Sequence, residues 1–150
     1  MECNKIDARS FYLAALSFCR EIAALCAELP IDYEEIQLQL ITIYSLGLQL
    51  QSVETESDEA VVRVNERIQT NFGALDNYWE VWDAYRNEEP VLGMLSDDIS
   101  DIRNDLMTGC LLYAQGKEES ALWQWRFDFR HHWSRHAVDA IRAVNQLIES

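Results

Sequence analysis

The sequence has few residues that interrupt helices and few positive charges. Only two prolines and five glycines occur in 150 residues, and 12 Lys and Arg face 26 Asp and Glu, for a formal net charge of −14. No glycine-rich phosphate loop and no Gly-x-Ser-x-Gly motif is present, so the common signatures of nucleotide binding and of serine hydrolases are missing. A chain this acidic repels nucleic acid and anionic membranes at long range, and we expect neither as a partner.

Cysteine is also scarce, and its placement argues against a cysteine-based metal site. Cys3, Cys19, Cys26 and Cys110 form no Cys-x-x-Cys pair and have no histidine within ligand spacing. Cys19 and Cys26 lie seven residues apart in an apolar stripe, which is typical of small buried side chains in a reducing compartment. The apolar stretch 11–19 is short for a membrane span and a poor signal peptide, so we expect a cytoplasmic protein.

Apolar residues recur at helical spacing through most of the chain. This periodicity predicts five helical regions, the third of which can divide in two: Asp7–Leu29, Asp32–Gln51, Asp58–Tyr85, Ser96–Gly116 and Glu118 to the C-terminus. Residues 86–95 are expected to form a loop. We therefore predict an all-α fold, a single-domain bundle of about five to six helices over residues 1–150.

Single residues refine this prediction. Asp32 and Ser96 are suited to cap helices, because their side chains can accept backbone hydrogen bonds that the first turn leaves unmade. Gly47 lies inside a helix, where it costs about 1 kcal/mol relative to alanine, so we expect another helix to approach closely there. The run Val61-Val62 is strand-like, but the helical period around it is the stronger signal.

Four carboxylates form a stripe on the fourth helix. Asp97, Asp98, Asp101 and Asp105 fall within about a quarter turn of one another. Such a stripe needs water, cations or basic partners, because like charges at this spacing repel. It can be a solvated face, a surface for basic side chains of the fifth helix, or half of a divalent metal site.

The fifth helix combines aromatic residues with arginine. Arg126 and Arg130 project from the same side as its apolar residues, next to Trp125. A guanidinium cannot lose its proton to escape burial, so we expect at least one of these arginines to pair with the aspartate stripe. Trp125, Arg126 and Arg130 are accordingly candidate binding residues.

A second row on the fifth helix carries histidine. Asp128, His132 and His136 follow at four-residue steps, with Asp139 close beyond. Two histidines four apart can chelate a metal, and a neighbouring carboxylate can orient the imidazole ring. The His-Glu-x-x-His zinc motif is missing. The row can therefore be a set of local pairs with Asp128 and Asp139, a metal site or a protein-contact surface.

The C-terminal half carries motifs that resemble a known family. They are Tyr78-Trp79, the run Glu89-Pro90-Val91-Leu92-Gly93, the run 96–102 (SDDISDI), Trp123-x-Trp125-x-Phe127, and His132-Trp133-x-x-His136-Ala137-x-Asp139-Ala140. Together they resemble the bacterial domain-of-unknown-function family numbered 5063, over about residues 77–144. The resemblance implies a small, mostly helical protein and transfers no catalytic role to any residue.

Two functions remain. The leading interpretation is a non-enzymatic protein-binding module, of inhibitor or immunity type, whose acidic and aromatic surface masks a basic protein partner and needs no cofactor. The alternative is a metal-dependent hydrolase with a divalent metal between the last two helices, with Asp98, Asp101, Asp128, His132 and His136 as candidate ligands. Asp105 belongs to the binding candidates in either case, and the oligomeric state stays open.

Overall fold

The computed structural model of the chain describes residues 5–54 and 61–150. Its helices are α1 (Ala8–Ala27), α2 (Tyr33–Leu48), α3 (Leu95–Ala114), α4 (Glu118–Asp128) and α5 (Ser134–Glu149), with a π-helical segment η2 (Phe129–Trp133) and a short 3₁₀ helix η1 (Gly73–Asp76). Strands β1 (Asn77–Glu80) and β2 (Val91–Met94) pair antiparallel, with Asn77 opposite Met94. The fold is mostly helical, as predicted, but it also contains this small sheet.

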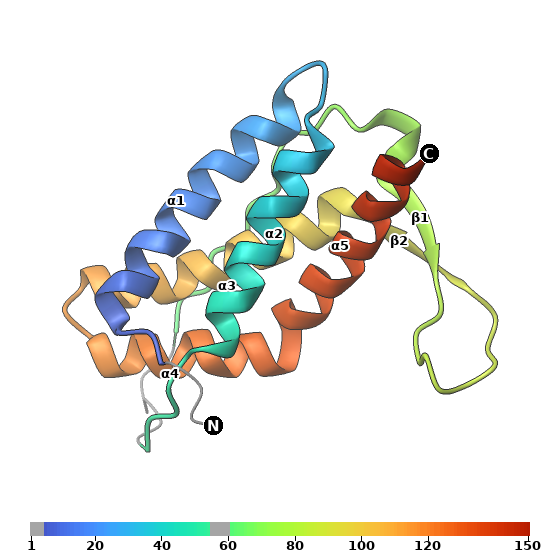
Figure 1. Cartoon of the computed structure of the whole chain (residues 1–150). Helices are drawn as coiled ribbons and strands as arrows, with labels where there is room; N and C mark the ends of the chain where they lie inside the picture. The colour runs from blue at the N-terminus through green and yellow to red at the C-terminus, as the bar shows by residue number, and fades with distance from the viewer. Residues whose placement is uncertain (1–4, 55–60) are drawn as a thin grey trace.

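The last helical region is one run that changes direction. α4, η2 and α5 follow one another without a break, and the chain turns sharply where α4 passes into α5 (Figure 1). In η2 the hydrogen bonds span five residues instead of four, with the Ser134 N–H donating to the Phe129 carbonyl. Counted this way, the described residues form four long helical runs, so the predicted number of five to six was too high.

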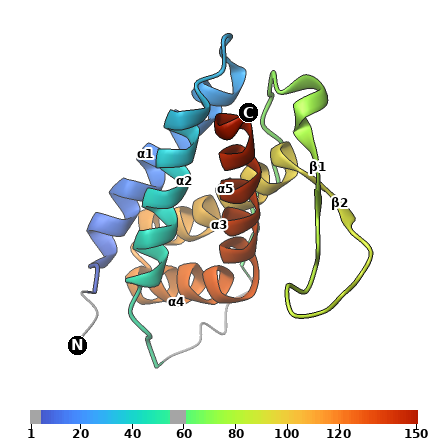
Figure 2. The ribbon, with the colours of Figure 1, turned by 45° about the vertical axis from the view of Figure 1, so that its right-hand side comes forward.

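The helices form a front layer and a crossing pair. α1, α2 and α5 lie side by side with α2 in the middle, while α3 crosses behind them and α4 runs across one end (Figures 1 and 2). Among the described residues, a single core cluster draws buried apolar side chains from all five helices. The β1–β2 hairpin lies on the outer side of α5, where it reaches away from the helices (Figure 2).

The N-terminal helices follow the sequence prediction closely. The side chains of Asp7 and Asp32 accept the backbone hydrogen bonds of Ser10 and Glu35, so both helices have the capped start that their sequences favour. By length and composition α1 is apolar enough to cross a membrane, a test that core helices also pass. Here its buried face carries seven side chains and packs against α2 and α3.

The predicted third helix was wrong. Its expected start at Asp58 lies outside the described residues, and residues 61–72 have no helical hydrogen bonds. Instead, the backbone N–H groups of residues 64, 66 and 68 donate to Thr108, Asn104 and Ser100 of α3. The donors are two residues apart in extended chain, which advances about 6.6 Å, and the acceptors are four residues apart in a helix, which advances about 6.0 Å. Because these two spacings are similar, alternate residues of the segment can each reach a side chain on successive turns of α3.

Two further details correct the prediction. Residues 86–95 were expected to be a loop, yet 91–94 form β2 and Leu95 begins α3. Ser96 does not cap α3, because it lies within the first turn. The Asp76 carboxylate of η1 takes the capping role, accepting from the Ser96 backbone N–H and hydroxyl at 2.7 Å each.

Glycine allows close helix contacts at two positions. A Cβ atom at Gly47 would lie 2.6 Å from the ring of Phe129 and 2.8 Å from Trp133, which confirms the expected close approach. At Gly109 of α3 it would lie 2.1 Å from Nε1 of Trp125. The Trp125 indole therefore lies directly on α3, where its N–H donates to the Leu106 carbonyl at 3.0 Å.

Candidate metal centre

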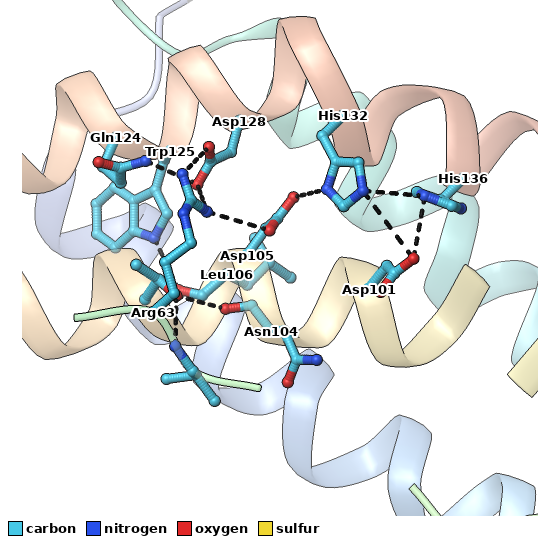
Figure 3. A network of polar contacts seen from close by, with 12 residues as sticks. Arg63, Asp101, Asn104, Asp105, Leu106, Gln124, Trp125, Asp128, His132 and His136 are labelled. Atoms are coloured by element: carbon cyan, nitrogen blue, oxygen red, sulfur yellow. Dashed lines mark hydrogen bonds and ion pairs between the residues drawn. The ribbon is translucent and has the colours of Figure 1, made fainter. Parts of the chain in front are cut away.

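Two helical faces meet where α3 passes the bend between α4 and α5 (Figure 3). α3 presents Asp98, Asp101 and Asp105, which steps of three and four residues align on one face. The opposing run presents His132 from η2 and His136 from α5, four residues apart. The side chains of these two elements point toward one another across the contact.

An aspartate of α3 orients each histidine ring. Nδ1 of His132 lies 2.6 Å from Oδ2 of Asp105, and Nδ1 of His136 lies 2.7 Å from Oδ1 of Asp98. A carboxylate accepts hydrogen bonds, so the hydrogen of each neutral ring belongs on Nδ1 and the lone pair on Nε2. The Tyr78 hydroxyl of β1 donates to the other oxygen of Asp98 and holds that carboxylate in place.

The two Nε2 atoms converge with a third carboxylate. They lie 3.2 Å apart, and Oδ2 of Asp101 lies 3.2 Å from Nε2 of His136 and 4.0 Å from Nε2 of His132 (Figure 3). These three atoms form a group within 4.8 Å of one another. Three electron-rich atoms at this spacing repel unless a proton or a metal ion lies among them.

The spacing fits a first-row metal ion. Around a tetrahedral ion with ligand distances of about 2.0–2.2 Å, the ligand atoms lie about 3.3–3.6 Å from one another. Metal-binding histidines usually donate their other ring N–H to a carboxylate, which is the role of Asp98 and Asp105 here. The side chains of Asp101, His132 and His136 are 40, 47 and 26% exposed, so the group also faces solvent.

A second set of ion pairs lies beside this group. Arg63, from the extended segment, donates to both carboxylate oxygens of Asp128 at 2.9 and 3.1 Å and lies 3.5 Å from Asp105 (Figure 3). Gln124 donates to the same Asp128 at 3.0 Å. Arg67 pairs with Asp97. These contacts occupy the carboxylates on either side of the group and leave Asp101 facing the imidazoles.

The region keeps an excess of negative charge. Five carboxylates and two guanidinium groups give a formal charge of −3 when both imidazoles are neutral: Asp97, Asp98, Asp101, Asp105 and Asp128 against Arg63 and Arg67. A divalent cation among the imidazoles and Asp101 would reduce this excess to −1. The local charge therefore favours a bound cation.

Burial and hydrogen bonding shift the pKa of the surrounding groups. Burial raises the pKa of Asp98, although the hydrogen bonds from His136 and Tyr78 oppose the shift. Burial likewise raises the pKa of Asp105 to about 6 against the opposing hydrogen bond of His132. For His136, burial lowers the pKa, but the hydrogen bond to Asp98 and the nearby carboxylates outweigh it and raise the pKa.

The structure brings together part of the predicted site. Asp101, His132 and His136 converge, and Asp98 and Asp105 orient the imidazoles; the local pairs expected with Asp128 and Asp139 are not formed by the histidines. Asp128 instead pairs with Arg63, apart from the histidines. Trp125 is fully buried in the core and offers no binding surface.

The expected pairing of Arg126 or Arg130 with the aspartate stripe was wrong. Within residues 5–54 and 61–150, neither arginine forms an ion pair with Asp97, Asp98, Asp101 or Asp105. Both line a hollow against α2 instead. At ~100° per residue Arg126 points about 200° away from Asp128, so the face that carries the arginines is turned away from α3.

Sequence reasoning missed Arg63, Arg67 and Tyr78. The two arginines lie in the segment predicted as a helix, so their contacts with α3 could not be anticipated. Tyr78 reaches Asp98 only because β1 follows directly after η1. The need for a cation near Asp128 was detectable in principle. Asp128 lies on the same helical face as His132 and His136, so once this face turns toward α3 its carboxylate is buried and requires a basic partner.

The fold and this group define a mostly helical protein in which two imidazoles and one carboxylate converge on a point between α3 and the bent C-terminal run. The chain belongs to the family described as domain of unknown function DUF5063, whose model matches residues 14–150. This confirms the resemblance seen in the C-terminal motifs and extends it into α1.

One solved structure shares the fold. The chain is similar to the crystal structure of protein BF1032 from Bacteroides fragilis, with a TM-score of 0.66, 17% sequence identity and 94% of each chain covered. At this identity the likeness shows the fold alone. No curated protein matches the sequence.

Proposed function

We propose that the protein binds a divalent first-row transition metal through Asp101, His132 and His136. The observation that carries the proposal is the convergence of two Nε2 atoms and one carboxylate oxygen, at 3.2, 3.2 and 4.0 Å, with a carboxylate on the Nδ1 of each ring. Imidazole nitrogen favours zinc, iron, copper or nickel over magnesium, and only one carboxylate is free to serve a hard cation here.

The ligand set favours catalysis over a purely structural role. Structural zinc sites use four protein ligands, whereas catalytic sites use three and leave a position for water or substrate. Asp101, His132 and His136 supply three, and their side chains are partly exposed. A metal bound there would activate water for hydrolysis, so metal-dependent hydrolysis is the activity that we propose. The chain's own residues orient the imidazoles through Asp98 and Asp105.

Metal titration of tag-free protein tests the proposal. We expect one equivalent of Zn²⁺ or Mn²⁺ to bind and to raise Tm, because a ligand of the folded state stabilises it by mass action. The substitutions His132→Ala and His136→Ala should abolish this shift. His131→Ala is the matched control, because the His131 ring packs in a tilted arrangement against Phe127 and takes no part in the group. Equal shifts in all three variants would contradict the proposal.

Hydrolysis is tested separately from metal binding. The metal-loaded protein should cleave a phosphate or carboxylate ester of p-nitrophenol faster than the buffer with the same metal, and Asp101→Asn should remove the excess rate. Retention of the rate in Asp101→Asn would assign it to a contaminant. Metal binding without any such excess would keep the metal site and reject the hydrolytic role.

A second candidate function rests on the hairpin. Trp79, Tyr85 and Leu92 are 69, 100 and 54% exposed. The loop between the strands carries Asp83, Glu88 and Glu89. We infer that such an acidic, aromatic projection suits a basic protein partner, in keeping with a binding module of inhibitor type.

A basic peptide of alternating lysine and valine is the probe for this surface. It should bind the protein with an affinity that falls as salt rises, and Trp79→Ala with Tyr85→Ala should weaken binding. Phe127→Ala is the control, as an exposed aromatic residue far along the chain on α4. Equal binding by the hairpin variant and the control would reject the candidate.

A further inference from the structure

A hollow with three cations lies between the N-terminal segment, the end of α2 and the α4–η2 run. It has a volume of about 280 Å³, and its lining includes Lys5, Arg126 and Arg130 together with the rings of Tyr44 and Phe129. Only 12 residues of this chain are Lys or Arg. The gathering of three of them in one concavity of a chain with a net charge of −14 therefore needs an explanation.

Among the residues that the structure describes, these cations have no acidic partner. Over residues 5–54 and 61–150, no carboxylate forms an ion pair with Lys5, Arg126 or Arg130, whereas Arg63, Arg67 and Arg103 are all paired. Burial and the charge of Arg130 both lower the pKa of Arg126, so the two guanidinium groups lie close enough to repel each other. Like charges held together in this way favour an anion between them.

The walls of the hollow are aromatic and apolar. Tyr44 of α2 and Phe129 of η2 lie with ring centroids 5.6 Å apart, and Leu48 and Leu50 also line the hollow. A smaller hollow of about 100 Å³ shares Arg126 and Arg130 and is lined by Trp123, Phe127 and His131. The two arginines thus lie between two groups of rings. This combination suits a ligand that joins an anionic group to a planar ring.

The position of the hollow on η2 is a further reason to expect a ligand. π-Helical segments are rare and occur frequently at functional sites. η2 directs His132 toward α3 and Arg130 toward α2, so the same segment contributes one residue to the histidine site and one to the hollow. The C-terminus of α2 also ends beside Lys5, where a cation offsets the helix dipole; that role explains one charge and leaves the two arginines unexplained.

We propose that the hollow lined by Lys5, Arg126 and Arg130 binds a small organic phosphate whose planar ring lies against Tyr44 and Phe129. The two guanidinium groups hold the phosphate by charge-assisted hydrogen bonds, and Ser134 belongs to the same lining. The volume is sufficient for a single ring with one phosphate, at the small end of ligand pockets. The site is separate from the group formed by Asp101, His132 and His136, which we call the histidine group.

Phenyl phosphate is the probe, used with the full chain in EDTA so that no metal takes part. Calorimetric titration should show saturable binding with one ligand per chain, at least about tenfold tighter than inorganic phosphate or phenol, and weaker at higher salt. The double substitution Arg126→Gln, Arg130→Gln should weaken binding by at least about tenfold. Arg20→Gln, an exposed arginine of α1, is the control and should bind as the wild type does.

Amide chemical shifts locate the ligand without any variant. Phenyl phosphate should shift the signals of residues 44–50 and 126–134 in the wild-type protein, which keeps the test decisive if the double variant does not fold. No saturable binding up to about 10 mM would overturn the proposal. Equal affinity for phenyl phosphate and inorganic phosphate, shifts confined to other regions, or equal binding by the double variant would overturn it too.

Discussion

At the scale of single residues, the histidine group depends on where two hydrogen atoms lie. Asp98 and Asp105 fix the Nδ1 of each ring, and this leaves both Nε2 lone pairs directed at one another at 3.2 Å. Neither aspartate touches the position where the lone pairs meet. Both therefore act by orienting the ligands, and the effect on metal affinity can be measured without removing a ligand.

Asp98→Asn should lower the affinity for Zn²⁺ by about 10–100-fold, the usual effect of losing the carboxylate behind a metal-binding histidine. The stoichiometry of one metal per chain should be unchanged, as measured by competition with a chelating dye. Asp97→Asn is the matched control, because Asp97 pairs with Arg67 and touches neither ring. An unchanged affinity in Asp98→Asn would show that the aspartate does not orient the ligand.

Leu40→Ala tests the packing of the core. Leu40 is fully buried, so its truncation should lower the free energy of unfolding by about 2–5 kcal/mol, as large-to-small changes in packed cores do. Leu38, two residues away and 56% exposed, is the control, and Leu38→Ala should have little effect in the same urea titration. Similar losses in both variants would show that α2 is turned differently about its axis.

The spacing of the histidines and of the aspartate stripe was readable from the sequence, because both lie on helices whose period is regular. The ion pairs were not readable. Whether Arg126 or Arg63 reaches an aspartate depends on which face of α4 turns toward α3, and several faces of that helix carry apolar residues. Arg63 had no predicted position near α3 at all.

At the scale of secondary-structure elements, the segment 61–72 shows why the helix prediction failed there. Val61, Val64 and Ile68 have helical spacing, but their side chains are β-branched, as are those of Val62 and Thr70, and such side chains also favour extended chain. Tertiary contacts decide the outcome: three side chains of α3, one per turn, accept the backbone N–H groups of alternate residues. Sequence periodicity alone does not show that the spacing of this extended segment matches that of the polar side chains on α3.

Arg63→Gln tests the link between this segment and α4. The substitution leaves the carboxylate of Asp128, which is nearly fully buried, without its bidentate partner. We expect a loss of about 1–3 kcal/mol of unfolding free energy, less than for a fully buried pair because half of the Arg63 side chain is exposed.

Arg67→Gln is the control for Arg63→Gln. Its partner Asp97 is itself partly exposed, and surface pairs contribute about 0–1 kcal/mol. Urea unfolding of the three proteins provides the comparison. A larger loss in Arg67→Gln than in Arg63→Gln would contradict the account of Asp128.

The contact between β1 and α5 should give a pH dependence. Burial, a hydrogen bond with Asp139 and the charges of Asp139 and Asp98 raise the pKa of Glu80 to about 7, while Arg135 opposes the shift. The folded protein therefore binds this proton more tightly than the unfolded chain, whose glutamate titrates near 4.5. The stability that Glu80 contributes is complete below 4.5 and is lost as the pH rises to about 7.

Glu80→Gln removes this titration. Relative to the wild type, the variant should gain Tm as the pH is raised from 5 to 8, measured by thermal unfolding at constant ionic strength. Glu88→Gln, in the loop of the same hairpin, is the control for a simple loss of one negative charge. A constant difference in Tm across this range would mean that Glu80 titrates normally in the folded protein.

At the scale of the whole molecule, the net charge of −14 is distributed unevenly. Arginines from the extended segment balance part of the aspartate stripe, yet Asp101 and two imidazole lone pairs remain turned toward one point. On the opposite side of η2, three cations share a hollow. The sequence predicted the excess of acid and the helical class, but the separation of the two charged regions arises from the bend at η2.

The central claim is that a transition metal binds Asp101, His132 and His136, and anomalous diffraction from crystals grown with equimolar Zn²⁺ tests it most directly. We expect a peak at the zinc edge within about 2.0–2.2 Å of both Nε2 atoms and of one Asp101 oxygen. The peak should be missing from crystals of His132→Ala. A zinc peak at other side chains, or none at this point in the wild-type protein, would contradict the account.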